Sequence, residues 1–458
     1  MTVAAPRPRP ARQAPTDFTL PVGRAAIDEV APIDGTTDWL PADRQAAFDA
    51  FEALPAESNV LYTTYIDLRS AQLGAAGLVS SPRADPVSTE LPDGTDGLIV
   101  IDEGDIVGVA LSPAATAAGV EFTTIADLAS RDPERVRALL EGGSALPSDD
   151  RFAQLTRALW TQGVVLDIPA GVSLTQPVII RWAAGAADRA LLSRTIIALG
   201  DGAGAVVLEE LVGSDGTGPD GGQSFLAGTL EVTLGRDAKL EVASLQELPT
   251  TTVAFQHRNA VIGEGATLHW ALAQLGSHLV RSRVDNRLEG DRSSVEQVEI
   301  VFGGTDQLFD LTSYTHHIGR DTTGNLLSKG ALLDRARSFM KGMIVIDRSA
   351  VGTDSFLGEF GMNLSKATRS VAIPSLEIDQ PDCRRAAHAS SVGPIDESQL
   401  FYLESRGIPP DEARRMIVLG FLEPVVARVP HADARERLRD LLEQKWDAGI
   451  GAGAVSTA

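Results

Sequence analysis

Apolar residues at helical spacing are mixed with short strand-like runs in the first third of the chain. Residues 41–54 repeat apolar side chains every third or fourth position, which predicts an amphipathic helix. Residues 97–111 predict two short strands around an acidic turn. Residues 124–142 predict two short helices, and 149–163 predict another that begins with acids and ends at a glycine. We therefore expect this part to be mostly helical.

The pattern changes at residue 164. Helical spacing gives way to apolar alternations of about four to seven residues, the length of a strand, separated by Gly, Asp and Ser. A turn residue followed by a small residue recurs about every thirty residues, which is typical of a β-solenoid. A β-sandwich also fits short strands with regular turns and stays open as the alternative. The recurring pairs are Gly204-Ala205, Asp237-Ala238, Gly265-Ala266, Ser293-Ser294, Thr323-Gly324 and Ser349-Ala350.

Helical spacing returns near residue 395. Asp396 is a good N-cap for a helix over 395–407, with Gln399 three residues further on. A second helix is expected from Pro410, because proline and acids favour a first turn. A third is expected over 431–446. The predicted organisation is a disordered tail (1–37), a mostly helical domain (38–163), a β-solenoid core (164–390) and a C-terminal helical domain (391–458).

Composition excludes several classes of protein. The chain has 458 residues and a formal net charge of −22, which disfavours binding to nucleic acid and to anionic membranes because both require basic surfaces. No apolar run reaches the length of about 18 residues that spans a bilayer. The single cysteine, Cys383, cannot form an intramolecular disulfide and fits a reducing compartment, so we expect a cytoplasmic protein.

Known catalytic motifs are missing, which predicts a protein that is not an enzyme. The sequence has no P-loop, no H-E-x-x-H and no C-x-x-C. The adjacent His316 and His317 would point to opposite faces of a strand and cannot share a metal ion. Solenoid enzymes that cleave glycans use paired acids, but no convincing pair is present, and we interpret the candidates as solvated turn residues. These candidates are Asp306, Asp310, Asp321, Asp334 and Asp347.

One segment near the end of the solenoid combines soft and borderline metal ligands. Cys383 and His388 stand five residues apart, with two arginines between them. Thiolate and imidazole both suit iron or zinc. By itself the signal is weak, and a buried structural thiol is the preferred interpretation of Cys383.

The stretch from His388 to Pro424 resembles the C-terminal signature of the SufB/SufD family, and residues 332–356 are more similar to its SufD branch than to its SufB branch. The matching residues are HASSVGPIDESQLFYLESRGIPPDEARRMIVLGFLEP, and LLDRARSFMKGMIVIDRSAVGTDSF (332–356) and TTYIDLR (63–69) are also similar. The resemblance implies a mainly β fold, a right-handed parallel β-helix with helices at both ends. It also implies a scaffold for iron–sulfur cluster assembly in the SUF system.

The resemblance further implies the partners and the residues that contact them. A SufB-like subunit, or a second copy as homodimer mate, would pair through the β-helix, and a SufC ATPase would bind the C-terminal helical domain. His388 matches a histidine implicated in cluster formation. No permanently bound cofactor is implied, only a transient iron–sulfur cluster shared with the partner. We expect the SufC contact at Phe401, Tyr402, Met416 and Phe421.

Two alternative functions stay open. A SufB-like or homodimeric scaffold would carry the cluster itself, although a single cysteine supplies too few thiolates for a cluster within one chain. A β-helical carbohydrate-active enzyme is the alternative from another class. Co-purification with an ATPase and a SufB-like chain would separate these functions.

Overall fold

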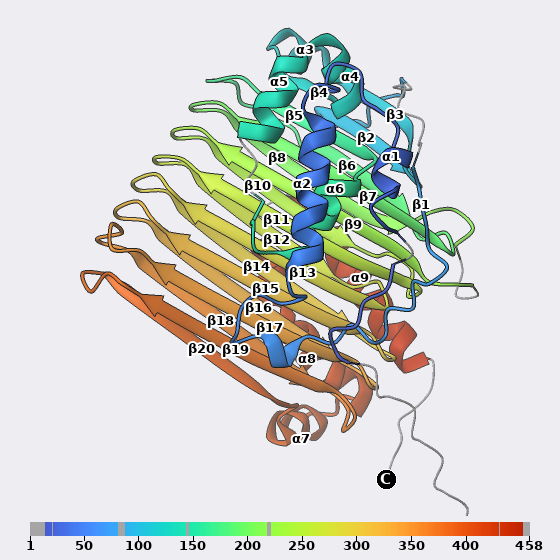
Figure 1. Ribbon diagram of the computed structural model, residues 1–458. Helices are drawn as coiled ribbons and strands as arrows, with labels where there is room; N and C mark the ends of the chain where they lie inside the picture. Colours follow the sequence, from blue (N-terminus) through green and yellow to red (C-terminus); the bar gives the residue numbers. More distant parts are fainter. Residues whose placement is uncertain are drawn as a thin grey trace, which may run out of the picture.

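The chain winds into a flattened coil in which each turn adds one strand to each of two facing ten-stranded sheets (Figure 1). The computed structural model describes residues 14–20, 22–80, 88–142, 146–217, 221–429 and 431–451.

The two sheets, A and B, collect alternate strands of the chain. Sheet A contains β4 (Glu121–Thr124), β5 (Gln162–Ile168), β7 (Arg189–Leu199), β9 (Ser224–Leu234), β11 (Thr252–Ile262), β13 (Leu279–Leu288), β15 (Leu308–His317), β17 (Arg337–Ile346) and β19 (Arg369–Ile378), with β1 (Gly77–Leu78) beside β7. Sheet B contains β3 (Asp105–Leu111), β2 (Gly97–Asp102), β6 (Val178–Ala184), β8 (Gly204–Gly213), β10 (Lys239–Gln246), β12 (Thr267–Gln274), β14 (Ser294–Gly303), β16 (Thr323–Leu332), β18 (Asp354–Asn363) and β20 (Arg385–Pro394).

Successive coils stack in parallel and in register. Lys239 of β10 pairs with Gly204 in the coil before it and with Thr267 in the coil after it. Only β3 and β4, next to the N-terminal helices, are paired antiparallel in the described part of the sheets. A sandwich would need antiparallel neighbours throughout. The predicted parallel β-helix is therefore confirmed, and the β-sandwich is excluded.

The strands are longer than the apolar runs that predicted them. β7, β9 and β11 each have 11 residues rather than four to seven. Polar residues at inward positions, such as Glu209, Ser244 and Arg258, interrupt the apolar alternation without ending the strand. Apolar periodicity therefore underestimates strand length wherever the interior is polar.

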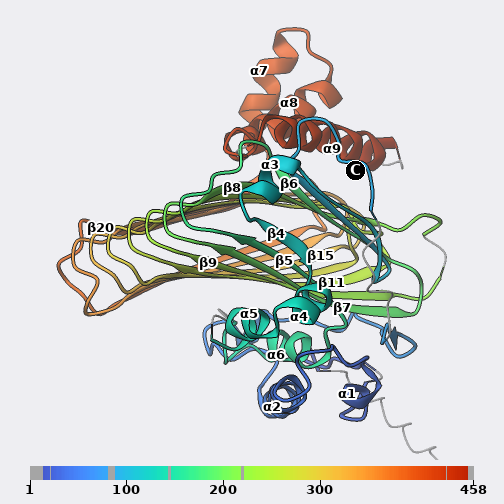
Figure 2. The ribbon, with the colours of Figure 1, turned by 90° about the horizontal axis from the view of Figure 1, so that it is seen from above.

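Apart from α3 (Pro113–Ala117), the N-terminal helices lie on the side of the outer face of sheet A (Figure 2). Phe18 packs against Phe152 and Phe255 with ring centroids 5.2 and 5.3 Å apart. The expected disordered tail is therefore wrong for its described part, whereas residues 1–13 and 21 lie outside the described residues. The helices of this region are α1 (Ala26–Glu29), α2 (Leu40–Ala53), η1 (Thr63–Tyr65), α3 (Pro113–Ala117), α4 (Ile125–Arg131), α5 (Pro133–Arg137), η2 (Ala138–Gly142) and α6 (Arg151–Leu159).

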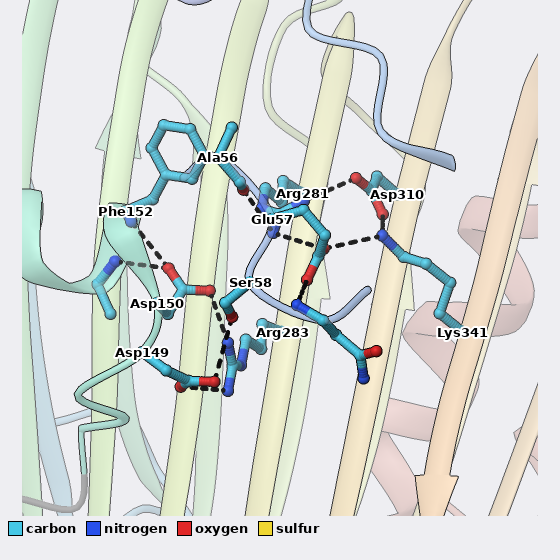
Figure 3. Close-up of polar contacts among 12 residues, drawn as sticks. Ala56, Glu57, Ser58, Asp149, Asp150, Phe152, Arg281, Arg283, Asp310 and Lys341 are labelled. Carbon is cyan, nitrogen blue, oxygen red and sulfur yellow. Dashed lines mark hydrogen bonds and ion pairs between the residues drawn. The ribbon is translucent and has the colours of Figure 1, made fainter. Parts of the chain in front are cut away.

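A buried group of ion pairs fastens this N-terminal region to sheet A (Figure 3). Glu57 follows α2, and its Oε2 lies 3.2 Å from Nη2 of Arg281 on β13. Lys341 on β17 pairs with Asp310 at 2.5 Å and with Glu57 at 3.6 Å. These side chains are at most 3% exposed, so each charge depends on its neighbours for compensation.

The C-terminal helices pack on the outer face of sheet B, opposite the N-terminal ones (Figure 2). They are α7 (Glu397–Ser405), α8 (Pro410–Val426) and α9 (Ala432–Gly451). Val418 and Leu422 of α8 and Leu438 of α9 are buried in one cluster with Ile300 and Phe302 of β14. This apolar cluster holds the C-terminal helical domain against sheet B.

Candidate functional site

The final coil of the solenoid has free edges. Strands β19 and β20 end the two sheets, and within the described part of the chain no strand pairs with their outer sides. Both strands are 10 residues long. An uncovered edge of this length presents a row of backbone donors and acceptors to another chain. The outer edges of β19 and β20 are thus free within the described part of the chain (Figure 1, lower end).

The described residues also leave the inward face of the final coil uncovered. His388 stands in register with Leu357 of the preceding coil, and Ser390 with Glu359. Leu357 and Glu359 are 1% and 2% exposed, whereas their counterparts His388 and Ser390 are exposed. Val392, in register with Gly361 on the same face, is 39% exposed. The interior of the solenoid is therefore open at this end, and His388 stands in the opening.

Cys383 lies in the turn that leads into β20. It is half-buried with a free thiol, so it is not the buried structural cysteine that we preferred. Among the described residues, no three His, Cys, Asp or Glu side chains converge closely enough to hold a metal ion. Any metal bound through His388 would therefore need further ligands from water or from another chain.

Of the four residues expected to contact a partner, three are exposed on the helical domain and one is partly buried. Phe401 and Tyr402 of α7 and Met416 of α8 are 73%, 57% and 47% exposed, which is unusual for large apolar side chains. Phe421 differs, because it packs partly buried against the apolar cluster on sheet B, and its ring lies 4.6 Å from Nζ of Lys329. The first three can meet a partner directly, whereas Phe421 holds α8 on the solenoid.

Other residues considered from the sequence take part in structural contacts. His316 and His317 do point to opposite faces: His316 Nε2 lies 2.9 Å from Asp347, and His317 bonds with Thr322 and Ser355 inside the solenoid. Burial lowers the pKa of His317 to about 4, so it is neutral. Asp310 is not a solvated turn residue as expected, because it is a buried strand residue paired with cations.

Sequence reasoning missed the carboxyl groups inside the solenoid. Glu209, Glu299 and Glu359 lie in one column of sheet B, linked through the registers of intervening strands. Burial raises the pKa of Glu299 to about 7 and that of Glu359 to about 8. Glutamates within the alternating strands were visible in the sequence. The sequence did not show which face of each strand points into the solenoid, so their burial could not be predicted.

Comparison with known proteins identifies the family of this chain. Residues 182–421 match the family described as "SUF system FeS cluster assembly, SufBD core domain", which covers more than half of the chain. The chain belongs to the SufBD family. The resemblance noted in its C-terminal motifs is confirmed, and the matched region includes the β-helix from the end of β6 onward, the open final coil and most of α8.

Two relatives show the extent of the similarity. The iron-sulfur cluster assembly protein SufD of Bacillus subtilis is 28% identical over 328 residues, which cover 71% of this chain and 74% of that protein. An iron-sulfur cluster assembly SufBD family protein of Mycobacterium tuberculosis is 31% identical over 234 residues, which cover 50% of this chain and 59% of that protein. The chain thus aligns with little more than half of the mycobacterial relative.

In the part of the chain that the structure describes, no helix is long and apolar enough to cross a bilayer.

Proposed function

We propose that this SufBD family protein is a scaffold subunit in iron–sulfur cluster assembly and pairs with a SufB-like subunit through the free edges of β19 and β20. The open final coil is the observation that carries this proposal, because β19 and β20 have no strand partner on their outer sides among the described residues. Ile378 and Val392 at this end are 44% and 39% exposed. A partner that continued both sheets would satisfy the backbone groups and cover these side chains.

The exposed face of α7 and α8 is the proposed binding surface for a SufC-type ATPase. Phe401, Tyr402 and Met416 provide the large apolar anchors that dominate protein interfaces. The sequence has no P-loop of its own. ATP chemistry would therefore take place in the partner, and this chain would act as a scaffold subunit rather than an enzyme.

His388 is the proposed contact with the nascent cluster, which is the substrate of the assembly and not a resident group of this chain. Its exposed position on β20 places an imidazole at the seam that the partner would cover. Imidazole binds iron, and thiolates from the partner would complete the coordination. Cys383 lies close in sequence but carries no independent support as a ligand.

Co-expression with a SufB-like chain and a SufC-type ATPase tests the proposal. Ile378→Lys and Val392→Lys place charges at the free edge and should abolish recovery of the SufB-like chain while retaining the ATPase. Val107→Lys is the matched control, because Val107 is 42% exposed on β3, at the opposite end of sheet B. A wild-type chain that purifies without either partner would contradict the proposal. A complex holding only two copies of this chain would favour the homodimeric alternative.

A further inference from the structure

One buried acid near the open end has no partner that explains its burial. Glu359 of β18 is 2% exposed, and its Oε2 has no hydrogen-bond partner among the described residues. The backbone N–H of Ile373 donates the hydrogen bond that the carboxyl accepts. Glu209, in the same column, instead lies 2.6 Å from Arg258. An unpaired carboxyl is costly to bury. The burial of Glu359 therefore needs an explanation, whereas the burial of Glu209 is explained by its ion pair with Arg258.

The interior is shaped to leave room for this carboxyl. Gly342 of β17 faces Glu359 across the solenoid, and a Cβ at Gly342 would lie 2.8 Å from Oε1 of Glu359. The next coil along the solenoid is the final one. There the residue in register with Glu359 is Ser390, which is small and exposed. The carboxyl therefore lies one coil beneath the opening, with only a serine above it in its own column.

His388 stands next to this position. It is two residues before Ser390 on β20 and faces the same side, so the Cβ atoms of His388 and Glu359 are about 8 Å apart by ordinary strand spacing. A glutamate and a histidine side chain can both reach one ion across that gap, with metal–ligand bonds of about 2.0–2.2 Å. Carboxylate and imidazole together suit a divalent transition metal such as Fe²⁺.

We propose that Glu359 and His388 form a two-residue binding site for a divalent transition metal at the open end of the solenoid. The ion enters past Ser390, and water or the partner subunit supplies the remaining ligands. This inference rests on the proposed function, in which His388 faces the nascent cluster. It adds an entry site for iron that includes a residue from the preceding coil.

Titration of the purified full-length chain with Co²⁺, a stand-in for Fe²⁺ with visible absorption, tests the inference. Glu359→Gln and His388→Ala should each weaken Co²⁺ binding by about tenfold or more. The double variant should lose little beyond either single variant, because both residues hold one ion. Glu299→Gln is the matched control, since Glu299 is a buried carboxyl of the same column, two coils further inside.

A second variant guards against a folding defect in Glu359→Gln. Ser390→Leu changes an exposed edge residue, leaves the acid in place and covers the path to it, so it should also weaken Co²⁺ binding. Affinity that is unchanged in both Glu359→Gln and Ser390→Leu would overturn the inference, as would a wild-type chain that binds no Co²⁺. Recovery of the SufB-like and ATPase partners is measured separately, so the inference and the proposed function can fail independently.

Discussion

Arg258 of sheet A and Glu209 of sheet B form an ion pair across the interior of the solenoid. Nη2 of Arg258 lies 2.6 Å from Oε2 of Glu209, and Ser244 bonds with both side chains. The two sheets are therefore connected by a polar bridge as well as by apolar packing. Removing one member would leave a buried charge without compensation.

We expect Arg258→Met to lower the free energy of unfolding by about 3–5 kcal/mol, because Glu209 would remain charged and unpaired. Urea denaturation measures this loss. The double variant with Glu209→Met should recover most of it, since apolar side chains replace the pair. A loss below about 1 kcal/mol in the single variant would show that the bridge contributes little.

Glu57 is expected to fasten the N-terminal region to sheet A. Glu57→Ala removes the acid shared by Arg281 and Lys341, and we expect a loss of about 3 kcal/mol in stability with faster hydrogen exchange around Tyr62. Glu52→Ala is the control, because Glu52 pairs with Arg24 at the surface, where its side chain is 56% exposed. The control should lose less than about 1 kcal/mol. Equal losses would contradict a special role for the buried pairs.

Glu299 should make stability depend on pH. Burial raises the pKa of Glu299 from an ordinary value of 4.5 to about 7, so between these values the folded chain holds a proton that the unfolded chain has lost. The contribution of Glu299 to the free energy of unfolding is therefore fully present below pH 4.5 and is lost as the pH rises to about 7. The free energy of unfolding should fall by up to about 1.4 kcal/mol per pH unit in this range. Glu299→Gln should remove this contribution. Identical pH profiles of unfolding in the two proteins would contradict the shift.

Substitution by alanine should have different effects at Phe401 and at Phe421. Phe401→Ala changes an exposed side chain, so stability should shift by less than about 0.5 kcal/mol while the SufC-type ATPase is lost on co-purification. Phe421→Ala removes packing and the contact with Lys329, so it should lower stability by about 1–3 kcal/mol. Thermal denaturation and co-purification together separate the two effects. An ATPase that still binds the Phe401→Ala variant would remove that residue from the docking surface.

His388→Ala should leave complex assembly intact but reduce the yield of iron–sulfur cluster, because the edge strands remain while a proposed ligand is lost. Cluster absorbance after reconstitution of the purified complex measures the yield. His269→Ala is the control, since His269 is another partly exposed strand histidine, 39% exposed on β12 and away from the free edge. Full yield from the His388 variant would exclude this residue from the site.

Much of the fold could be predicted from the sequence because it follows from local patterns. Pairs such as Gly265-Ala266 recur at turns, and a single coil cannot bury its inward side chains, so repetition itself indicates stacking. The capping residue Asp396 and the proline at Pro410 begin helices near the predicted positions. These features depend on neighbours in the sequence, and the C-terminal motif that contains His388 indicated the family directly.

The tertiary structure alone decided which polar residues are buried and what they meet. Asp310 and Glu359 look like ordinary acids in an acidic chain, yet one lies in a buried ion-pair group and the other beneath the open coil. Phe401 and Phe421 are equally apolar, but only one faces solvent. Burial and charge compensation depend on the residues that the coils before and after bring close, and the sequence of one segment does not contain that information.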